Sequence, residues 1–158
     1  GWFHTGDIGE FEGTHLRITD RKKDLLVLGN GKNVAPQPVE NRLKESEFIA
    51  EAMLLGDGQE HCTALIIPEF ERVQGWLKAK GVDEPDTSKI VERDDVRDLI
   101  RKEVEAANKT LADFERVRRH VLVPQAFSVD GGELTPSLKV RRKVVKDKYA
   151  DLIQSLEK

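Results

Sequence analysis

Four stretches of this sequence carry residue types that a plain hydrophobic core does not need. They are residues 1–7 (GWFHTGD), 20–24 (DRKKD), 29–36 (GNGKNVAP) and 134–139 (LTPSLK). An ionised Asp7 offers only hydrogen-bond acceptors, which suits the two hydroxyls of a sugar. The guanidinium of Arg21 can donate in a fork to phosphate or ribose oxygens. Glycines such as those at 29 and 31 let a backbone approach a ligand closely.

Each of these stretches also has an ordinary structural explanation. Asp7 could close an Asx turn, and Gly29-Asn30-Gly31 could be only a tight turn, because both residue types tolerate positive φ. Arg21 could belong to a solvated strand end. Lys139 opens a run of ten residues, 139–148, that holds six basic side chains and could form a solvated helix face. Single residues therefore leave these alternatives open.

Composition excludes several classes of protein. The chain has 158 residues, of which 38% are hydrophobic and 35% charged, and its net charge of −3 gives no global field that favours nucleic acid. No apolar run is long enough to span a membrane, and no basic-then-apolar leader predicts a signal peptide. Cys62 is expected to be a small buried hydrophobe. Together with the four scattered histidines it gives no zinc-ligand spacing, so no metal site is predicted.

Periodicity predicts the elements that must position these residues. Extended segments around Phe11 and at 16–18 favour an N-terminal hairpin. Further strands are predicted at 25–28, 52–55, 62–67 and 120–123. Helices are predicted at 36–44, 70–81, 96–111 and over the stripe formed by Val145, Tyr149, Leu152 and Leu156, with a surface loop at 82–93. The order of elements predicts an α+β fold, with a small three-stranded sheet packed with helices.

Taken together, the order and spacing of the four stretches carry more information than any of them alone. The succession GWFHTGD, ITDRKKD at 18–24, NVAP at 33–36 followed by Val39-Glu40, and LTPSLK resembles the adenylate-forming enzymes. Within that family the sequence is most similar to long-chain fatty-acid CoA ligases. The resemblance covers the whole chain, as the C-terminal part of such an enzyme.

The resemblance implies a division of the chain. Residues 1–19 would be the tail of a large N-terminal domain, residues 20–24 the hinge with Lys23 in it, and residues 25–158 a small mobile domain. In this family the large domain holds the acyl pocket and the phosphate loop, and the small domain swings over it. By this resemblance the chain alone is expected to be inactive.

The resemblance also implies roles for particular residues. Asp7 matches the carboxylate that binds the ribose hydroxyls of ATP and AMP, and Arg21 matches an arginine that contacts the nucleotide at the hinge. Lys139 matches the catalytic lysine that bridges the fatty-acid carboxylate and the α-phosphate. The segment Gly29, Asn30, Gly31, Lys32 and Asn33 matches the part that lines the coenzyme A tunnel after rotation. The sequence departs from the family pattern at Leu138, where a glycine commonly precedes the lysine.

The function implied is ATP-dependent activation of a long-chain fatty acid to acyl-AMP, followed by formation of acyl-CoA. ATP, Mg²⁺ and coenzyme A are the implied cofactors, bound mainly through the N-terminal domain, and that domain and the fatty acid are the implied partners. The alternatives are a fatty-acyl-AMP ligase, an aryl or medium-chain acyl-CoA ligase, or a non-catalytic module that binds through its basic last helix. The expected location is cytoplasmic, with peripheral membrane contact left open.

Overall fold

A three-stranded sheet forms the centre of the fold. The computed structural model describes residues 7–12, 15–21 and 25–157, with side chains from 25 to 156. The sheet order is β5 (Ile49–Leu55), β6 (Cys62–Pro68) and β7 (Val117–Leu122), with β5 antiparallel and β7 parallel to β6. The three predicted strands are confirmed, although the first and the last begin three residues earlier than predicted.

Three helices connect the parallel pair β6 and β7, as that pairing requires. They are α2 (Phe70–Ala79), α3 (Thr87–Ile90) and α4 (Asp94–Asn108). Helix α3 corrects the prediction of a loop throughout 82–93. Its start is capped by Asp86, whose carboxylate accepts a hydrogen bond from the Ser88 backbone N–H at 3.0 Å, and Ile90 is fully buried beneath it.

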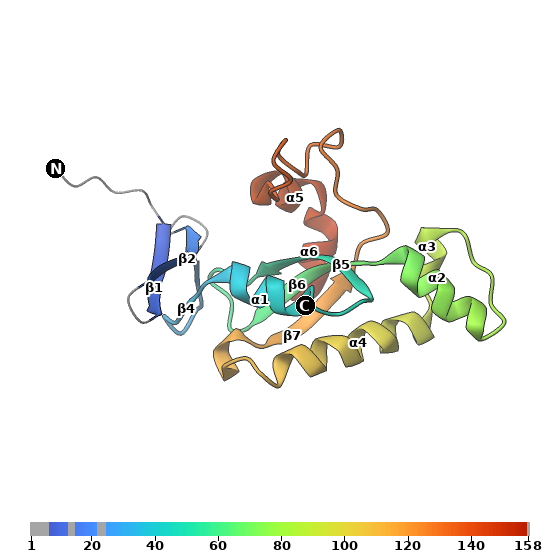
Figure 1. Ribbon diagram of the computed structural model, residues 1–158, viewed down its shortest axis with the longest axis horizontal. Coiled ribbons are helices and arrows are strands. Elements are labelled where there is room, and N and C mark those ends of the chain that lie inside the picture. The colour runs from blue at the N-terminus through green and yellow to red at the C-terminus, as the bar shows by residue number, and fades with distance from the viewer. Residues whose placement is uncertain (1–6, 13–14, 22–24, 158) are drawn as a thin grey trace.

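Helices cover both faces of this sheet (Figure 1). Alternate side chains of β6 point to opposite faces, so Ala64 and Ile66 join one hydrophobic cluster while Leu65 and Ile67 join another. The first cluster contains residues of α1 (Pro36–Leu43), α2, α3 and α4. The second contains residues of α5 (Arg142–Lys148) and α6 (Ala150–Glu157). Burial on both faces explains why every residue of β6 except Thr63 is apolar.

Cys62 belongs to the first cluster and is fully buried, as predicted. Burial raises the pKa of its thiol to about 11. Its Sγ lies 3.5 Å from the Phe114 carbonyl oxygen. The thiol is therefore a packing group.

The last helix is interrupted, which corrects the prediction of one continuous helix. Tyr149 leaves the helical conformation with φ −109° and ψ 26°, and divides α5 from α6. Its ring packs 6.3 Å from the ring of Phe127, between centroids. The predicted stripe still faces the core, because Val145 and Leu156 are both buried on the same side of the sheet. No helix among the residues that the structure describes is long and apolar enough to cross a membrane.

Two small hairpins precede the sheet. Strand β1 (Asp7–Glu12) pairs antiparallel with β2 (His15–Arg21), as predicted. The predicted strand at 25–28 is reduced to β3 (Leu26–Val27), which pairs with β4 (Asn33–Val34) around the predicted turn. Strand β2 contacts α1, so the hairpin lies beside the helix that follows it (Figure 1).

Candidate active site

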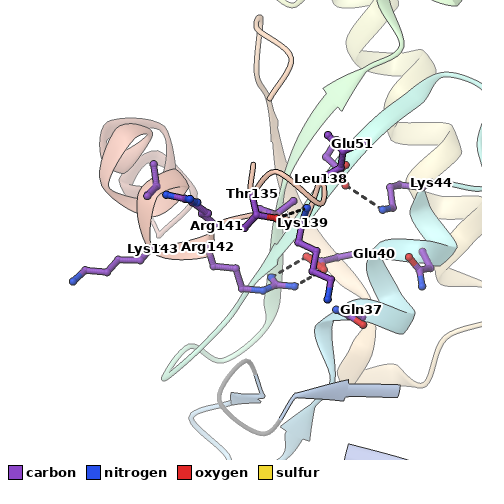
Figure 2. Close-up of a pocket in the computed structure, with 13 residues that line it drawn as sticks. Gln37, Glu40, Lys44, Glu51, Thr135, Leu138, Lys139, Arg141, Arg142 and Lys143 are labelled. Atoms are coloured by element: carbon purple, nitrogen blue, oxygen red, sulfur yellow. Dashed lines mark hydrogen bonds and ion pairs between the residues drawn. The ribbon is translucent and has the colours of Figure 1, made fainter. Parts of the chain in front are cut away.

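A pocket of about 720 Å³ separates α1 from the segment that carries Lys139. Its walls come from α1, from β5 through Glu51, and from the chain between Thr135 and Val144. Figure 2 shows the side chains that line it. Segments about one hundred residues apart in the sequence therefore meet at one site.

The segment around Lys139 is a hydrogen-bonded hairpin tip. Leu134 and Val140 form an antiparallel bridge at its base. Thr135 holds the tip: its backbone N–H donates to the Lys139 carbonyl oxygen at 2.8 Å, and its hydroxyl accepts from the Lys139 N–H at 3.0 Å. The Leu138 N–H donates to the Thr135 carbonyl at 2.8 Å. These bonds fix the backbone from which the lysine side chain extends.

Leu138 adopts a left-handed backbone conformation, with φ of 64°. Among the described residues it is the one non-glycine residue with positive φ. A side chain in this region costs about 1–2 kcal/mol, which is why glycine usually occupies the position that closes a three-residue hairpin loop. The departure from the family pattern noted in the sequence thus falls where the backbone favours glycine.

The Lys139 side chain reaches from the hairpin tip toward α1 (Figure 2). It is exposed, and within the described part of the chain its ammonium has no hydrogen-bond or ion-pair partner. Arg141 and Lys143 line the same pocket and likewise lack a carboxylate partner among these residues. The two carboxylates that line it are already engaged, Glu51 with Lys44 at 3.2 Å and Glu40 with Arg142. The surplus of positive charge suits an anionic ligand such as a phosphate.

Glu40 joins α1 to the start of α5 through a buried ion pair. Glu40 is 6% exposed. The Arg142 guanidinium donates hydrogen bonds to both oxygens of its carboxylate, at 2.9 and 2.5 Å. The backbone N–H of Leu54 in β5 adds a third hydrogen bond at 2.8 Å. Burial raises the pKa of the Glu40 carboxyl, and the Arg142 guanidinium opposes that shift. Because Arg142 lies three residues after Lys139, this pair anchors the lysine segment to α1.

Glu133 anchors the other side of the hairpin. It is 2% exposed and pairs with the ammonium of Lys148 in α5, and it also accepts from the Ser128 backbone N–H at 3.3 Å. The hydrogen bond from Lys148 holds the pKa of the Glu133 carboxyl below its usual value. The Arg141 N–H donates to the Glu133 carbonyl oxygen at 2.7 Å. The hairpin is thus fastened at both ends of its base.

Glu40 and Glu133 are site residues that sequence reasoning missed as such. A signal for Glu40 exists in the helix pattern. Pro36, Val39 and Leu43 are buried on α1, and Glu40 occupies the same face at helical spacing. A charged residue at a core position of a helix requires a partner, and this could have singled it out. Glu133 lies in an irregular loop, where periodicity gives no such signal.

The two residues expected to contact the nucleotide face each other in the β1–β2 hairpin. Asp7 is the register partner of Arg21, so the pairing of the strands brings together residues that are distant in sequence. The expected hinge residue Lys23 lies outside the described residues.

The segment from Gly29 to Asn33 forms the exposed turn after β3 and the first residue of β4. Gly31 has φ of 86°, and its N–H donates to the Leu28 carbonyl at 2.8 Å. The Asn30 side chain accepts from the Lys32 N–H at 3.0 Å, and the Gly29 N–H donates to the Gln59 carbonyl at 2.8 Å. The turn is thereby attached to the β5–β6 loop, and none of its residues lines the Lys139 pocket. The sites expected for adenylation and for coenzyme A lie apart.

Within the described ranges, no three His, Cys, Asp or Glu side chains gather as the ligands of a metal ion would. The cations around Lys139 suit the oxygens of a nucleotide or a carboxylate more than a metal. The side chains of this pocket therefore suit an anionic ligand.

This fold and site define a small α+β domain that presents a lysine at a rigid hairpin tip. The sequence matches the family described as the AMP-binding enzyme C-terminal domain over residues 23–158, and the chain belongs to that family. It is 37% identical to the long-chain-fatty-acid–CoA ligase FadD15 of Mycobacterium tuberculosis, over 99% of this chain and 26% of that protein. It is 34% identical to the long-chain-fatty-acid–CoA ligase 1 of Homo sapiens, over 99% of this chain and 23% of that protein.

Solved structures share the fold. The adenylation domain of a carboxylate reductase from Mycobacterium chelonae matches with a TM-score of 0.78 and 22% identity, over 98% of this chain and 23% of that chain. The corresponding domain from Segniliparus rugosus, solved with AMP and a co-purified carboxylic acid, matches with a TM-score of 0.75 and 22% identity, over 96% of this chain and 22% of that chain. The chain spans about a quarter of the length of the curated relatives it matches.

Proposed function

We propose that this chain is the C-terminal domain of a long-chain fatty-acid–CoA ligase, which uses ATP to join a fatty acid to coenzyme A. The names of relatives that match along its whole length support the substrate class. The observation that carries the chemistry is Lys139, an unpaired ammonium at a hydrogen-bonded hairpin tip in a cationic pocket.

In the first half-reaction, a carboxylate oxygen of the fatty acid attacks the α-phosphorus of ATP. A phosphorus–oxygen bond forms, pyrophosphate leaves, and the product is acyl-AMP. Negative charge gathers on the phosphate oxygens in the transition state, and an ammonium placed there stabilises it more than the ground state.

In the second half-reaction, the coenzyme A thiolate attacks the acyl carbonyl and AMP leaves. We propose that Lys139 moves away at this stage by rotation of residues 25–158 about a hinge at 20–24, with Lys23 in it, while residues 1–19 stay with the large domain. Asp7 would bind the ribose hydroxyls and Arg21 the nucleotide. Their opposition in the β1–β2 register is consistent with a shared ligand. The turn Gly29, Asn30, Gly31, Lys32 and Asn33 would then line the coenzyme A tunnel.

ATP, Mg²⁺ and coenzyme A would be bound mainly by the N-terminal part of the enzyme. The described residues hold no cluster of metal ligands. We place the enzyme in the cytoplasm and leave peripheral membrane contact open. A fatty-acyl-AMP ligase and an aryl or medium-chain ligase differ in acceptor or acid, so assays with acids of several lengths, with and without coenzyme A, separate them.

The test is made on the full-length protein that contains this chain. Palmitate-dependent pyrophosphate release is compared between the wild type and Lys139→Ala, with thioester formation from synthetic palmitoyl-AMP as a second assay. We expect the substitution to lower pyrophosphate release about 10²–10³-fold, as for removal of an oxyanion donor, and to spare thioester formation. Lys102→Ala is the matched control, because this exposed lysine of α4 does not line the pocket.

Two results would contradict the proposal. If the wild type releases no pyrophosphate with any fatty acid, the substrate class is wrong and other carboxylic acids must be tested. If Lys139→Ala is as active as the wild type and the Lys102→Ala control, Lys139 is only a surface lysine.

A further inference from the structure

Leu138 combines two unfavourable features at one position. Its φ of 64° is in the region that favours glycine, and its side chain is 69% exposed. Among the described residues, the other exposed large hydrophobic side chains are Val27 and Val129, at 46% and 43%. A strained residue persists where the surrounding structure and its function require it. A glycine at 138 would remove both the strain and the exposed apolar surface.

The position of Leu138 in the hairpin links it to Lys139. The two residues are adjacent, so their Cα atoms are about 3.8 Å apart. The bonds from Thr135 hold the backbone of both. If Lys139 enters a site in the large domain, as the proposed function requires, the tip enters with it. The Leu138 side chain must then move from water into that domain.

We infer that Leu138 is a positioning residue: its side chain packs against an apolar wall of the large N-terminal domain and holds Lys139 in place during adenylate formation. This inference rests on the proposed function. The large domain is the chosen partner because about three quarters of each curated relative lies outside the matched region. Burial of a leucine side chain there offsets the strain at this position.

The experiment uses three variants of the full-length protein. Leu138→Asn removes the apolar side chain and keeps a residue that tolerates left-handed backbone. Leu138→Met keeps an apolar side chain of similar volume. Val129→Asn is the matched control, since Val129 is an exposed apolar residue of the preceding loop. Each is measured for pyrophosphate release with palmitate and with octanoate, for thioester formation from palmitoyl-AMP, and for melting temperature.

We expect Leu138→Asn to lower pyrophosphate release about 10-fold or more, the loss that corresponds to one buried leucine side chain. The loss should be equal for both acids, because the contact is with protein. Thioester formation should be unchanged, and the melting temperature should stay at or above the wild-type value because strain is relieved. Leu138→Met and Val129→Asn should release pyrophosphate as the wild type does.

Several results would overturn this inference. Wild-type activity in Leu138→Asn would show that the side chain has no such contact. A loss confined to palmitate would mean that Leu138 touches the acyl chain instead of the domain. A loss that affects both half-reactions together with a lower melting temperature would mean a structural role only. If the wild type itself is inactive with every acid, the proposed function fails, and this inference fails with it.

Discussion

His120 is a half-buried residue of the central sheet. It lies in β7, where burial, and then the positive charge of Arg101 in α4, lower the pKa of its imidazole from the ordinary value of 6.5. As the pH falls below that value, the unfolded chain binds the proton before the folded chain does. The stabilisation is therefore complete above the unfolded-state pKa of 6.5 and is lost as the pH falls toward the lower folded-state pKa.

We predict that His120→Gln removes this part of the pH dependence. Midpoints of urea unfolding are measured at about pH 7.5 and about pH 5.5 for the wild type and for His120→Gln. A group changes the stability with pH only where its pKa differs between the folded and the unfolded chain. The midpoint of the wild type should fall more between these conditions than that of His120→Gln. An equal fall would show that the imidazole titrates alike in the folded and unfolded chains.

Some individual residues could be predicted from sequence and others could not. Burial of Cys62 was expected from its residue type and its apolar neighbours, and it is confirmed. The exposure of Lys139 is compatible with both interpretations of this residue, a solvated surface lysine and a catalytic lysine. The partners of Glu40 and Glu133 could not be predicted, because Arg142 is 102 residues from Glu40 and because the Glu133 pair depends on how a loop folds onto α5. Such pairs follow from the tertiary structure.

At the scale of elements, the ion pair between Glu40 and Arg142 connects α1 to α5. We predict that Arg142→Leu destabilises the protein by about 3–5 kcal/mol, because it leaves the Glu40 carboxylate buried without its cation. The free energy of unfolding is measured in urea. Arg141→Leu is the matched control, since Arg141 lines the same pocket and has no carboxylate partner among the described residues.

The double variant Glu40→Leu with Arg142→Leu should recover much of the loss, because no buried charge remains. If Arg142→Leu costs no more than Arg141→Leu, the pair adds nothing to stability. The Lys139 segment would then be held through Glu133 and Lys148, which connect it to α5 and not to α1.

Regular elements were predicted well where their side chains follow a simple pattern. The apolar run of β6 and the three-or-four spacing of α4 gave the sheet and its longest helix. The break at Tyr149 was missed because residues on either side keep one apolar stripe, and only the packing of the ring against Phe127 marks the position. Helix α3 was missed because its cap, Asp86, lies in a polar segment that also suits a loop.

The composition of segment 139–148, with six basic residues, suggested a basic binding surface. The structure gives less support to such a surface. Two of its six cations are engaged in ion pairs, Arg142 with Glu40 and Lys148 with Glu133. Of the other four, Lys139, Arg141 and Lys143 line the pocket beside α1. This weakens the alternative of a module that binds through a basic last helix.

We predict that the 158-residue chain alone, mixed with ATP and palmitate, releases no pyrophosphate above the uncatalysed background. Its described pocket is cationic, but an acid and ATP must be held together for an ammonium to accelerate their reaction. The full-length protein in the same assay is the positive control. If the chain alone releases pyrophosphate, and Lys139→Ala abolishes that release, the large domain is not needed for the reaction and this prediction is wrong.

The parallel pairing of β6 with β7 has a consequence for how the domain folds. The central strand gains this second neighbour only after the whole segment of α2, α3 and α4 has been traversed. Closing so long a loop costs entropy before any contact repays it, so we expect this step to be slow relative to formation of α4 itself. Until it is complete, one edge of the largely apolar β6 stays unpaired, and two molecules can associate through it. Refolding yield should therefore fall as protein concentration rises.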